Sequence, residues 1–268
     1  MTESVKAFSF GGGVQSVAAL VLAVQGRIDY RTFIFANVGD DSEYPETMRY
    51  VREVAIPYAE AHGLELIEVK KTRRDGSTET LWEKLHRTDR SIDIPVRMWN
   101  GAPGNRGCTA DFKIKPVAKE MRRLGATKSA PGMVGIGTRQ DCMALIRAAG
   151  LAVPPKSSCF FCPFHAIPVW QDLYTKEPEL FQRAVGLEKM INERRDLLGR
   201  LPVWLTSRAK PLDQVITGEH ENQLSMLVEG DDGQYSCGPF TCDGGAGEPA
   251  AGADEHGFII KTSRPPAA

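Results

Sequence analysis

Three consecutive glycines follow a short apolar run near the start of the chain and precede a segment typical of a helix. The stretch is KAFSFGGGVQSVAAL, residues 6 to 20. A strand, a glycine-rich turn and a helix start form a common phosphate-binding geometry, because backbone N–H groups and the helix dipole point at the turn. Glycines also let an anion approach the backbone closely. The same stretch is consistent with a tight turn of purely structural purpose, so other segments must decide.

The cysteines are the second group of residues that could do chemistry. Cys159 and Cys162 form a CxxC pair followed by proline, a pattern common in zinc and iron–sulfur sites. Cys108 precedes a predicted helix, whose N-terminus should lower the pKa of its thiol. His165 is a further potential ligand but is expected to be solvated, and Cys142 is expected to pack in the core. A bound metal, a redox dithiol and unliganded thiols all remain open from the spacing alone.

Length and composition place these residues in an ordinary globular protein. The chain has 268 residues, a net charge of -1 and 42% hydrophobic residues. The near-neutral charge gives no global attraction to nucleic acid, and no apolar run approaches the roughly 20 residues needed to span a bilayer. The N-terminus lacks a signal-peptide pattern. We therefore expect a cytoplasmic protein with no membrane partner and no disulfide framework.

The elements that would position these residues alternate between strand and helix. Strands are expected at Val5–Phe10, Thr32–Ala36, Leu64–Val69 and Met133–Ile136. Helices are expected at Val14–Val24, from Pro45, from Thr109 and at Pro178–Leu198. This order predicts an α/β fold with a parallel sheet and helices on both faces. We divide the chain into a nucleotide-binding domain (1–150), a cysteine-bearing helical segment packed on it (151–242) and a flexible tail (243–268).

A long loop is predicted between residues 73 and 107, rich in glycine and proline, and a loop of this length is more often functional than idle. Trp99 within it is placed to stack on a base, whereas the other tryptophans are expected in the core. The basic patch between residues 70 and 74 offers charges to a polyphosphate or a nucleic-acid backbone, although such a run is more often a solvated loop.

Four segments in chain order resemble motifs of one family. SFGGGVQS resembles the SGGxDS pyrophosphate loop, with Gly11 in place of the first serine and Gln15 in place of the aspartate. FANVGDDSEYPET resembles an "F.DTG...PET" segment, with Asn37 in place of the aspartate. NRGCTADFKIKPVAKEM and GIGTRQD resemble the two later motifs. Together they resemble the phosphoadenosine phosphosulfate (PAPS) reductase-like family of the adenine-nucleotide α-hydrolase (PP-loop ATPase) superfamily.

The resemblance implies a Rossmann-like fold of the adenine-nucleotide α-hydrolase type and a set of site residues. The implied metal ligands are Cys108, Cys159, Cys162 and a fourth cysteine, Cys242 rather than Cys237. They would hold a 4Fe–4S cluster, or alternatively Zn²⁺. The implied residues for ATP, bound with Mg²⁺, are Ser9, Gly11, Gly12, Gly13, Gln15, Ser16, Asn37, Gly39 and Arg139.

The function implied is adenylation in sulfur transfer or a related activation, with release of pyrophosphate from ATP. Its partners would be a nucleic acid or small-molecule acceptor and a sulfur donor or reductant protein. A sulfonucleotide reductase is the first alternative, although the E-C-G-x-H motif of the sulfate-assimilating reductases is absent. A nucleotide sensor without catalysis is the second, because Gln15 and Asn37 stand where acids are expected.

Overall fold

The computed structural model describes residues 5–87, 92–126, 128–131 and 137–217. Within this part of the chain, four parallel strands form one sheet in the order β3-β2-β1-β4. The predicted strand Met133–Ile136 lies outside the described residues, and the described strand β4 (Lys128–Pro131) ends just before it. The strands are β1 (Lys6–Phe10), β2 (Thr32–Asn37), β3 (Glu65–Lys70) and β4 (Lys128–Pro131).

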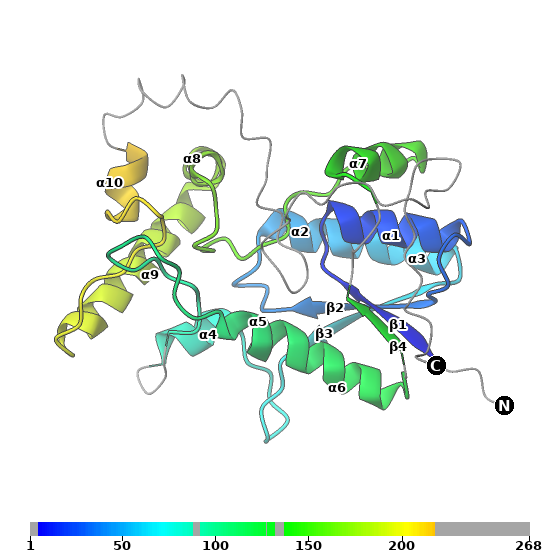
Figure 1. Ribbon diagram of the computed structural model, residues 1–268, viewed down its shortest axis with the longest axis horizontal. Helices are drawn as coiled ribbons and strands as arrows, with labels where there is room; N and C mark the ends of the chain where they lie inside the picture. The colour runs from blue at the N-terminus through cyan, green and yellow to red at the C-terminus, as the bar shows by residue number, and fades with distance from the viewer. Residues whose placement is uncertain (1–4, 88–91, 127, 132–136, 218–268) are drawn as a thin grey trace, which may run out of the picture.

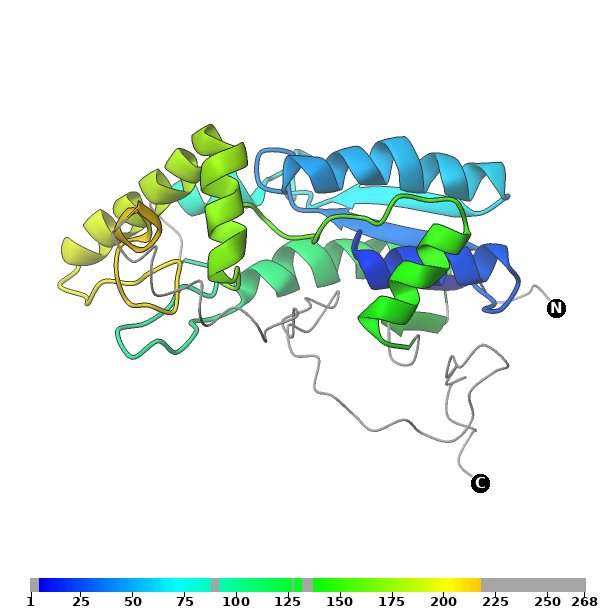
Figure 2. The same cartoon turned by 90° about the horizontal axis from the view of Figure 1, so that it is seen from above.

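Helices cover both faces of the sheet, as the alternation of strand and helix predicts (Figures 1 and 2). Alternate side chains of a strand point to opposite faces. Accordingly, Phe33 and Phe35 of β2 pack in the core beneath α1, while Ile34 packs with Val117 of α6 on the other face. The α/β class with a parallel sheet is therefore confirmed. The helices on the first face are α1 (Val14–Val24), α2 (Pro45–Tyr50), α3 (Ile56–Ala61) and α7 (Arg139–Ala148).

Two of the predicted helices continue through a proline by way of a π-helical turn. The turn Val51–Ala55 joins α2 to α3, and Ala110–Ile114 joins α5 (Gly107–Thr109) to α6 (Lys115–Arg123). Pro57 and Pro116 follow these turns at the second position of α3 and α6. Proline has no N–H to donate and its ring crowds the preceding turn, so a widened turn lets the helix continue.

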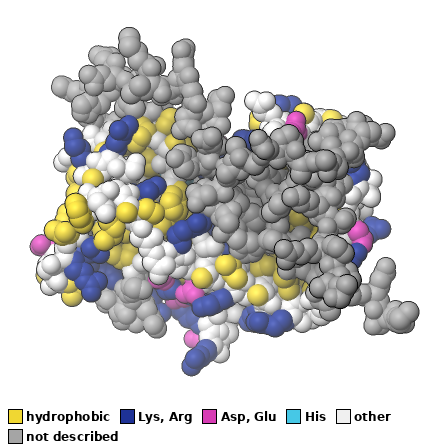
Figure 3. Space-filling model, viewed as in Figure 1, with side chains coloured by type: hydrophobic (Ala, Val, Ile, Leu, Met, Phe, Trp, Pro, Cys, Tyr) yellow, Lys and Arg dark blue, Asp and Glu magenta, His cyan; other side chains and the backbone are white. Residues whose placement is uncertain are grey.

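A second hydrophobic core lies at the other end of the molecule, where α8, α9 and α10 pack together. Residues from both sides of position 150 share it, including Phe112, Phe160 and Trp170. Figure 3 shows Lys and Arg side chains among hydrophobic ones on this end of the molecule. No described helix has both the length and the apolar character that crossing a membrane requires. The three helices are α8 (Ile167–Lys176), α9 (Pro178–Asp196) and α10 (Leu212–Thr217).

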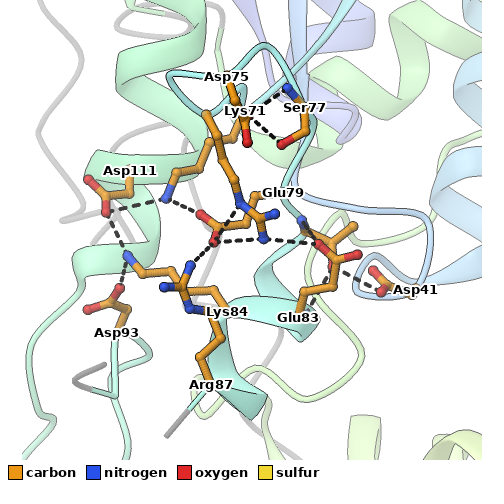
Figure 4. A network of polar contacts seen from close by, with 12 residues as sticks. Asp41, Lys71, Asp75, Ser77, Glu79, Glu83, Lys84, Arg87, Asp93 and Asp111 are labelled. Carbon is orange, nitrogen blue, oxygen red and sulfur yellow. Dashed lines mark hydrogen bonds and ion pairs between the residues drawn. The ribbon is translucent and has the colours of Figure 1, made fainter. Parts of the chain in front are cut away.

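The predicted loop between residues 73 and 107 contains a helix, α4 (Leu81–His86), that the sequence analysis did not predict. Thr80 and Glu83 cap its start reciprocally, which is the S/T-x-x-E capping signal in the sequence. Lys84 of this helix lies 2.7 Å from Asp111 and also contacts Asp93, so ion pairs fix α4 to the helix that follows Cys108 (Figure 4).

Candidate functional site

The glycine loop connects β1 to α1 at the carboxyl edge of the sheet. Gly13 is the N-cap residue of α1, in extended conformation, and no side chain of the described residues caps the helix. The first turn of α1 contains no acidic residue. The first backbone N–H groups of α1 therefore lack the side-chain acceptor that helix starts usually have, which suits an anionic ligand.

Gly12 and Gly13 differ in what a side chain would meet. Gly12 has φ +75°, and an added Cβ would lie 3.2 Å from Phe35 and 3.4 Å from Thr47 and Ser157. Gly13 has φ −98°, and an added Cβ would meet only the Cβ of Ser157, at 3.9 Å. Packing and backbone conformation thus explain Gly12 without a ligand, whereas they do not require glycine at position 13.

The other predicted residues of this loop are largely enclosed. Ser16 is buried, and its hydroxyl donates to the carbonyl of Gly13 at 2.8 Å. Ser9 is buried within β1, two residues before the half-buried Gly11. Gln15 is half-buried. For Ser16 to donate to a phosphate, its hydroxyl must first turn away from Gly13.

Asn37, at the end of β2, is the centre of a polar network. Its amide nitrogen donates to Asp40 at 2.6 Å and to Glu68 at 2.7 Å, and its oxygen accepts from the N–H of Gly39 at 2.7 Å. Arg52 donates to both carboxylates and, as the largest influence, lowers the pKa of Asp40. An aspartate at position 37 would face two carboxylates, so the amide is the side chain that fits this network.

Gly39 is required by the backbone. Its φ is +127°, and an added Cβ would lie 2.5 Å from both Asp41 and Thr80. Its carbonyl accepts the N–H groups of Ser42 and Glu43 at 3.0 and 2.9 Å. The residue therefore forms the turn that leads the chain from β2 towards α2 (Pro45–Tyr50).

Arg139 is exposed at the first position of α7, which packs against α1. Thr138 and Asp141 cap this helix reciprocally. Cys142 on the same helix is fully buried, and burial raises the pKa of its thiol to about 12. The prediction that Cys142 packs in the core is confirmed.

The CxxC segment folds back over the carboxyl edge of the sheet. Cys159 forms an antiparallel bridge with Glu43, flanked by hydrogen bonds from Tyr44 N–H to Ser158 at 3.0 Å and from Phe160 N–H to Ser42 at 3.1 Å. Ser157, just before it, lies beside the glycine loop, close to the Cβ positions of Gly12 and Gly13. A segment more than 100 residues downstream thus lies against both the glycine loop and the loop after β2.

The structure gathers three of the predicted cysteine ligands in one region. Burial raises the pKa of Cys159 well above its usual value, and the charges of Glu43, Cys162 and Cys108 act in the same direction. Burial also raises the pKa of Cys108, so the prediction that a helix N-terminus lowers it is wrong. Cys108 lies in the first turn of a helix that continues through Ala110–Ile114 into α6, but desolvation of the thiol outweighs the effect of the helix dipole.

Glu43 is a residue of this region that the sequence analysis missed. It is 1% exposed, and neither carboxylate oxygen has a hydrogen bond of ordinary geometry to a described residue. Burial raises its pKa, while the charge of Lys113 lowers it. In the sequence, Glu43 belongs to the acidic run GDDSE, which has the composition of a solvated loop.

The donor chemistry of this region suits a thiophilic metal, because three thiols lie near one another beside an orphaned carboxylate. Among the residues that the structure describes, however, no three Cys, His, Asp or Glu side chains are arranged so that they could hold a metal ion. Cys237 and Cys242, the candidates for the fourth ligand, lie outside those residues.

His165 is buried, not solvated as expected. Its Nε2 lies 2.8 Å from the hydroxyl of Ser158, and its ring packs edge-on against Trp170. Burial lowers the pKa of His165 to about 3. The neutral ring thus anchors the CxxC turn from within and does not face a metal or solvent.

The basic patch between residues 70 and 74 is largely paired with carboxylates. Lys71 lies 2.9 Å and Arg73 3.2 Å from the buried Glu79 (Figure 4). Lys70 lies 3.3 Å from Asp40. These ion pairs favour a structural role over the binding of a polyphosphate.

No family model, no curated protein and no solved structure matches this chain. Its function must therefore be argued from the residues and their arrangement.

Proposed function

We propose that this protein is a PP-loop-type enzyme that adenylates an acceptor and releases pyrophosphate, in sulfur transfer or a related activation. One observation carries the proposal. The uncapped start of α1 and the cysteine-bearing segment come together at the carboxyl edge of the parallel sheet, where Ser157 lies beside the glycine loop. Ligands of open α/β folds bind at this edge.

The chemistry proposed is a single displacement. An acceptor oxygen attacks the α-phosphorus of ATP, the bond from that phosphorus to the oxygen bridging it to the β-phosphorus breaks, and pyrophosphate leaves with the electron pair. The N–H groups of Gly13 and the first turn of α1 would stabilise the charge on the leaving group. Mg²⁺ would be held mainly by the phosphates, because Arg52 already engages Asp40 and Glu68.

Cys108, Cys159, Cys162 and Cys242 would hold a 4Fe–4S cluster, or alternatively zinc, beside this site. A cluster would supply the redox and sulfur-handling chemistry of the second stage. The chain's own contribution is the placement of three thiols near one another, with Glu43 and Lys113 around them.

A nucleotide sensor is the second candidate, and a specific observation favours it. The two side chains most expected to act on the nucleotide are occupied: the amide of Asn37 by Asp40, Glu68 and Gly39, and the hydroxyl of Ser16 by the carbonyl of Gly13. A site locked in this way can bind a nucleotide without turning it over.

The products formed from labelled ATP test the proposal. Anaerobically purified full-length protein is incubated with Mg²⁺ and ATP labelled at the α-phosphorus, with water as the default acceptor. We expect AMP and pyrophosphate in equal amounts. ADP and phosphate would contradict adenylation, binding without products would support the sensor, and sulfite released from a phosphosulfate would instead indicate the reductase.

The cofactor is tested by its metal content. Replacement of Cys108, Cys159 or Cys162 by Ser should abolish bound iron and sulfide, because a site that lacks one thiolate is labile. Cys142→Ser, at a buried packing position, is the control and should retain both. If the unmodified protein contains one zinc and no sulfide, the site binds zinc and not a cluster. If it contains no metal, both the cluster and the zinc site are contradicted.

A further inference from the structure

A basic surface lies beside the cysteine segment, built from two loops that are distant in the sequence. Residues 97–107 and 199–211 contain five arginines and lysines and no aspartate or glutamate. Arg97 and Trp204 exchange backbone hydrogen bonds of 2.7 and 2.9 Å, and the Cβ position of Gly101 lies 3.7 Å from the carbonyl of Ser207. The loops are therefore joined at Arg97 and Trp204, lie close together at Gly101 and Ser207, and form one surface.

The first loop presents an aromatic side chain to solvent. Backbone hydrogen bonds from Met98 to Ala102 and from Gly104 to Val96, both 2.8 Å, close residues 96–104 into a tight hairpin. Trp99 lies near its tip and is 65% exposed. A large exposed indole on a well-tied turn has no packing role, and it offers a flat face on which a base can stack.

Arginines extend this flat platform. The guanidinium groups of Arg97 and Arg106 lie 5.0 and 5.3 Å from the ring centre of Phe164, which follows Cys162 and Pro163. Within the part of the chain that the structure describes, the Arg97 side chain donates hydrogen bonds only at 3.4 Å, to the carbonyls of Pro163 and Gly101. At that length the bonds are weak, so this guanidinium keeps donors for a phosphate or a base edge.

The second loop adds point charges. Arg208 and Lys210 are exposed, and neither forms an ion pair with any carboxylate in the described ranges. The protein as a whole is nearly neutral, with a net charge of -1. Five cations within residues 97–107 and 199–211 therefore give this surface a local positive charge that the overall composition does not have.

We propose that the surface formed by Arg97, Trp99, Arg106, Phe164, Arg208 and Lys210 binds single-stranded nucleic acid. Phosphates lie on the cations and an unpaired base stacks on Trp99, a combination typical of single-strand binding. An anionic membrane needs charge and buried apolar area but no stacking platform, and a duplex hides its base faces. The binding stands by itself, whereas the role of this strand as the adenylated acceptor rests on the proposed function.

Fluorescence anisotropy with the full-length protein tests the binding. The probes are labelled single strands of RNA and DNA of about twelve nucleotides, a typical site size, together with the matching duplex. We expect single strands to bind more tightly than the duplex. Trp99→Ala should weaken single-strand binding about tenfold, and Trp99→Phe should restore most of the loss because it keeps a stacking face.

The charges are tested by the salt dependence. The double variant Arg208→Ala/Lys210→Ala should lower the slope of log affinity against log salt by about 1.4, for two phosphate contacts on a single strand. The control is Arg31→Ala/Arg122→Ala, which removes two exposed cations elsewhere and should change neither slope nor affinity. All variants change exposed side chains, so circular dichroism should show an unaltered fold.

Three results would overturn the proposal. They are equal binding by the Trp99→Ala variant and the unmodified protein, an equal loss in the control variant, or binding to vesicles of anionic phospholipid but not to single strands. Because anisotropy is measured without ATP, a failure here is distinguishable from a failure of adenylation. If single strands bind but are not adenylated, the proposed binding surface is supported, and only the proposed role of the strand as the acceptor is contradicted.

Discussion

At the scale of single residues, Asn37 shows how a departure from an expected motif follows from its neighbours. Its amide donates to two carboxylates, Asp40 and Glu68, that the single guanidinium of Arg52 also holds. The sequence shows only that an acid is absent at this position. The pairing of β2 with β3 brings Glu68, and the π-helical turn Val51–Ala55 brings Arg52, to the same edge of the sheet as Asn37.

Asn37→Asp should therefore destabilise the fold. The change removes two hydrogen-bond donors and adds a buried negative charge beside two others, which we expect to cost about 3 kcal/mol at neutral pH. Urea unfolding measures it. Gln140→Glu, an exposed amide-to-acid change, is the control and should be within about 0.5 kcal/mol of the unmodified protein. Equal stability of Asn37→Asp would contradict the network.

His165 makes stability depend on pH. Its pKa falls from 6.5 to about 3 on folding. Between these two values the imidazole of the unfolded chain binds a proton, whereas that of the folded chain does not. The contribution of His165 to the free energy of unfolding is therefore fully present above pH 6.5 and is lost as the pH falls towards 3. Between pH 7 and pH 5 the loss should be about 2 kcal/mol.

Unfolding of His165→Asn at several pH values tests this linkage. The variant should be less stable at pH 7, because it loses the contact with Ser158, but its stability should fall less between pH 7 and pH 5. His62→Gln, at an exposed position, should keep the original pH dependence. The same steep fall in His165→Asn would show that another group is responsible.

At the scale of elements, α9 fixes the second basic loop through one buried carboxylate. Glu188 accepts the N–H groups of Leu205 and Leu212 at 2.6 and 2.7 Å, and burial raises its pKa to about 7. Asn192, one turn later, exchanges hydrogen bonds of 2.8 Å with the backbone of Val203. The loop that carries Arg208 and Lys210 is thus held at both ends.

Glu188→Ala should destabilise this end of the molecule by about 3 kcal/mol, because two buried N–H groups lose their acceptor. Chemical denaturation measures the loss, and amide exchange should speed up in residues 203–212. Glu193→Ala, exposed on the same helix, should have little effect. Unchanged exchange in 203–212 would mean that packing alone holds the loop.

The elements also show what the sequence predicts and what it does not. The parallel sheet and the helices at Val14–Val24 and after Pro45 follow from hydrophobic runs bounded by glycine or proline, which are local signals. The helix α4 was missed although Thr80 and Glu83 carry a capping signal, because glycines and prolines dominate the surrounding loop. Neither π-helical turn is visible in a residue pattern, since each depends on how a helix passes a proline.

The candidate site divides in the same way. Residue types and spacing indicated the glycine loop and the CxxC pair, and the gathering of Cys108 with Cys159 and Cys162 was expected from the family resemblance. The position of Ser157 beside the glycine loop, the orphaned Glu43 and the burial of His165 were not predicted. The first two depend on a return of the chain after more than 100 residues, for which the sequence carries no local signal. His165 packs against Ser158 and Trp170, which are close to it in the sequence, but no residue pattern shows that this turn is buried.

At the scale of the whole molecule, two cores meet along the carboxyl edge of the sheet. The first core holds the glycine loop, and the second holds the cysteine segment and the basic surface. Cys159 bridges to Glu43 between them. The glycine loop, the three thiols and the proposed single-strand surface thus belong to neighbouring parts of the molecule, an arrangement consistent with the function that we propose.

The most direct test of the central claim is calorimetric titration of the Gly13→Val variant with a non-hydrolysable ATP analogue and Mg²⁺. Gly13 has an ordinary φ and room for a Cβ, so this variant should fold normally. Gly12→Val, strained by its positive φ and by Phe35, is the comparison and should be less stable. We predict that the unmodified protein binds the analogue and that folded Gly13→Val binds it at least tenfold more weakly, because the side chain covers the N–H groups that hold phosphate. Equal affinity of the two, or no binding by the unmodified protein, would show that the three glycines form only a turn.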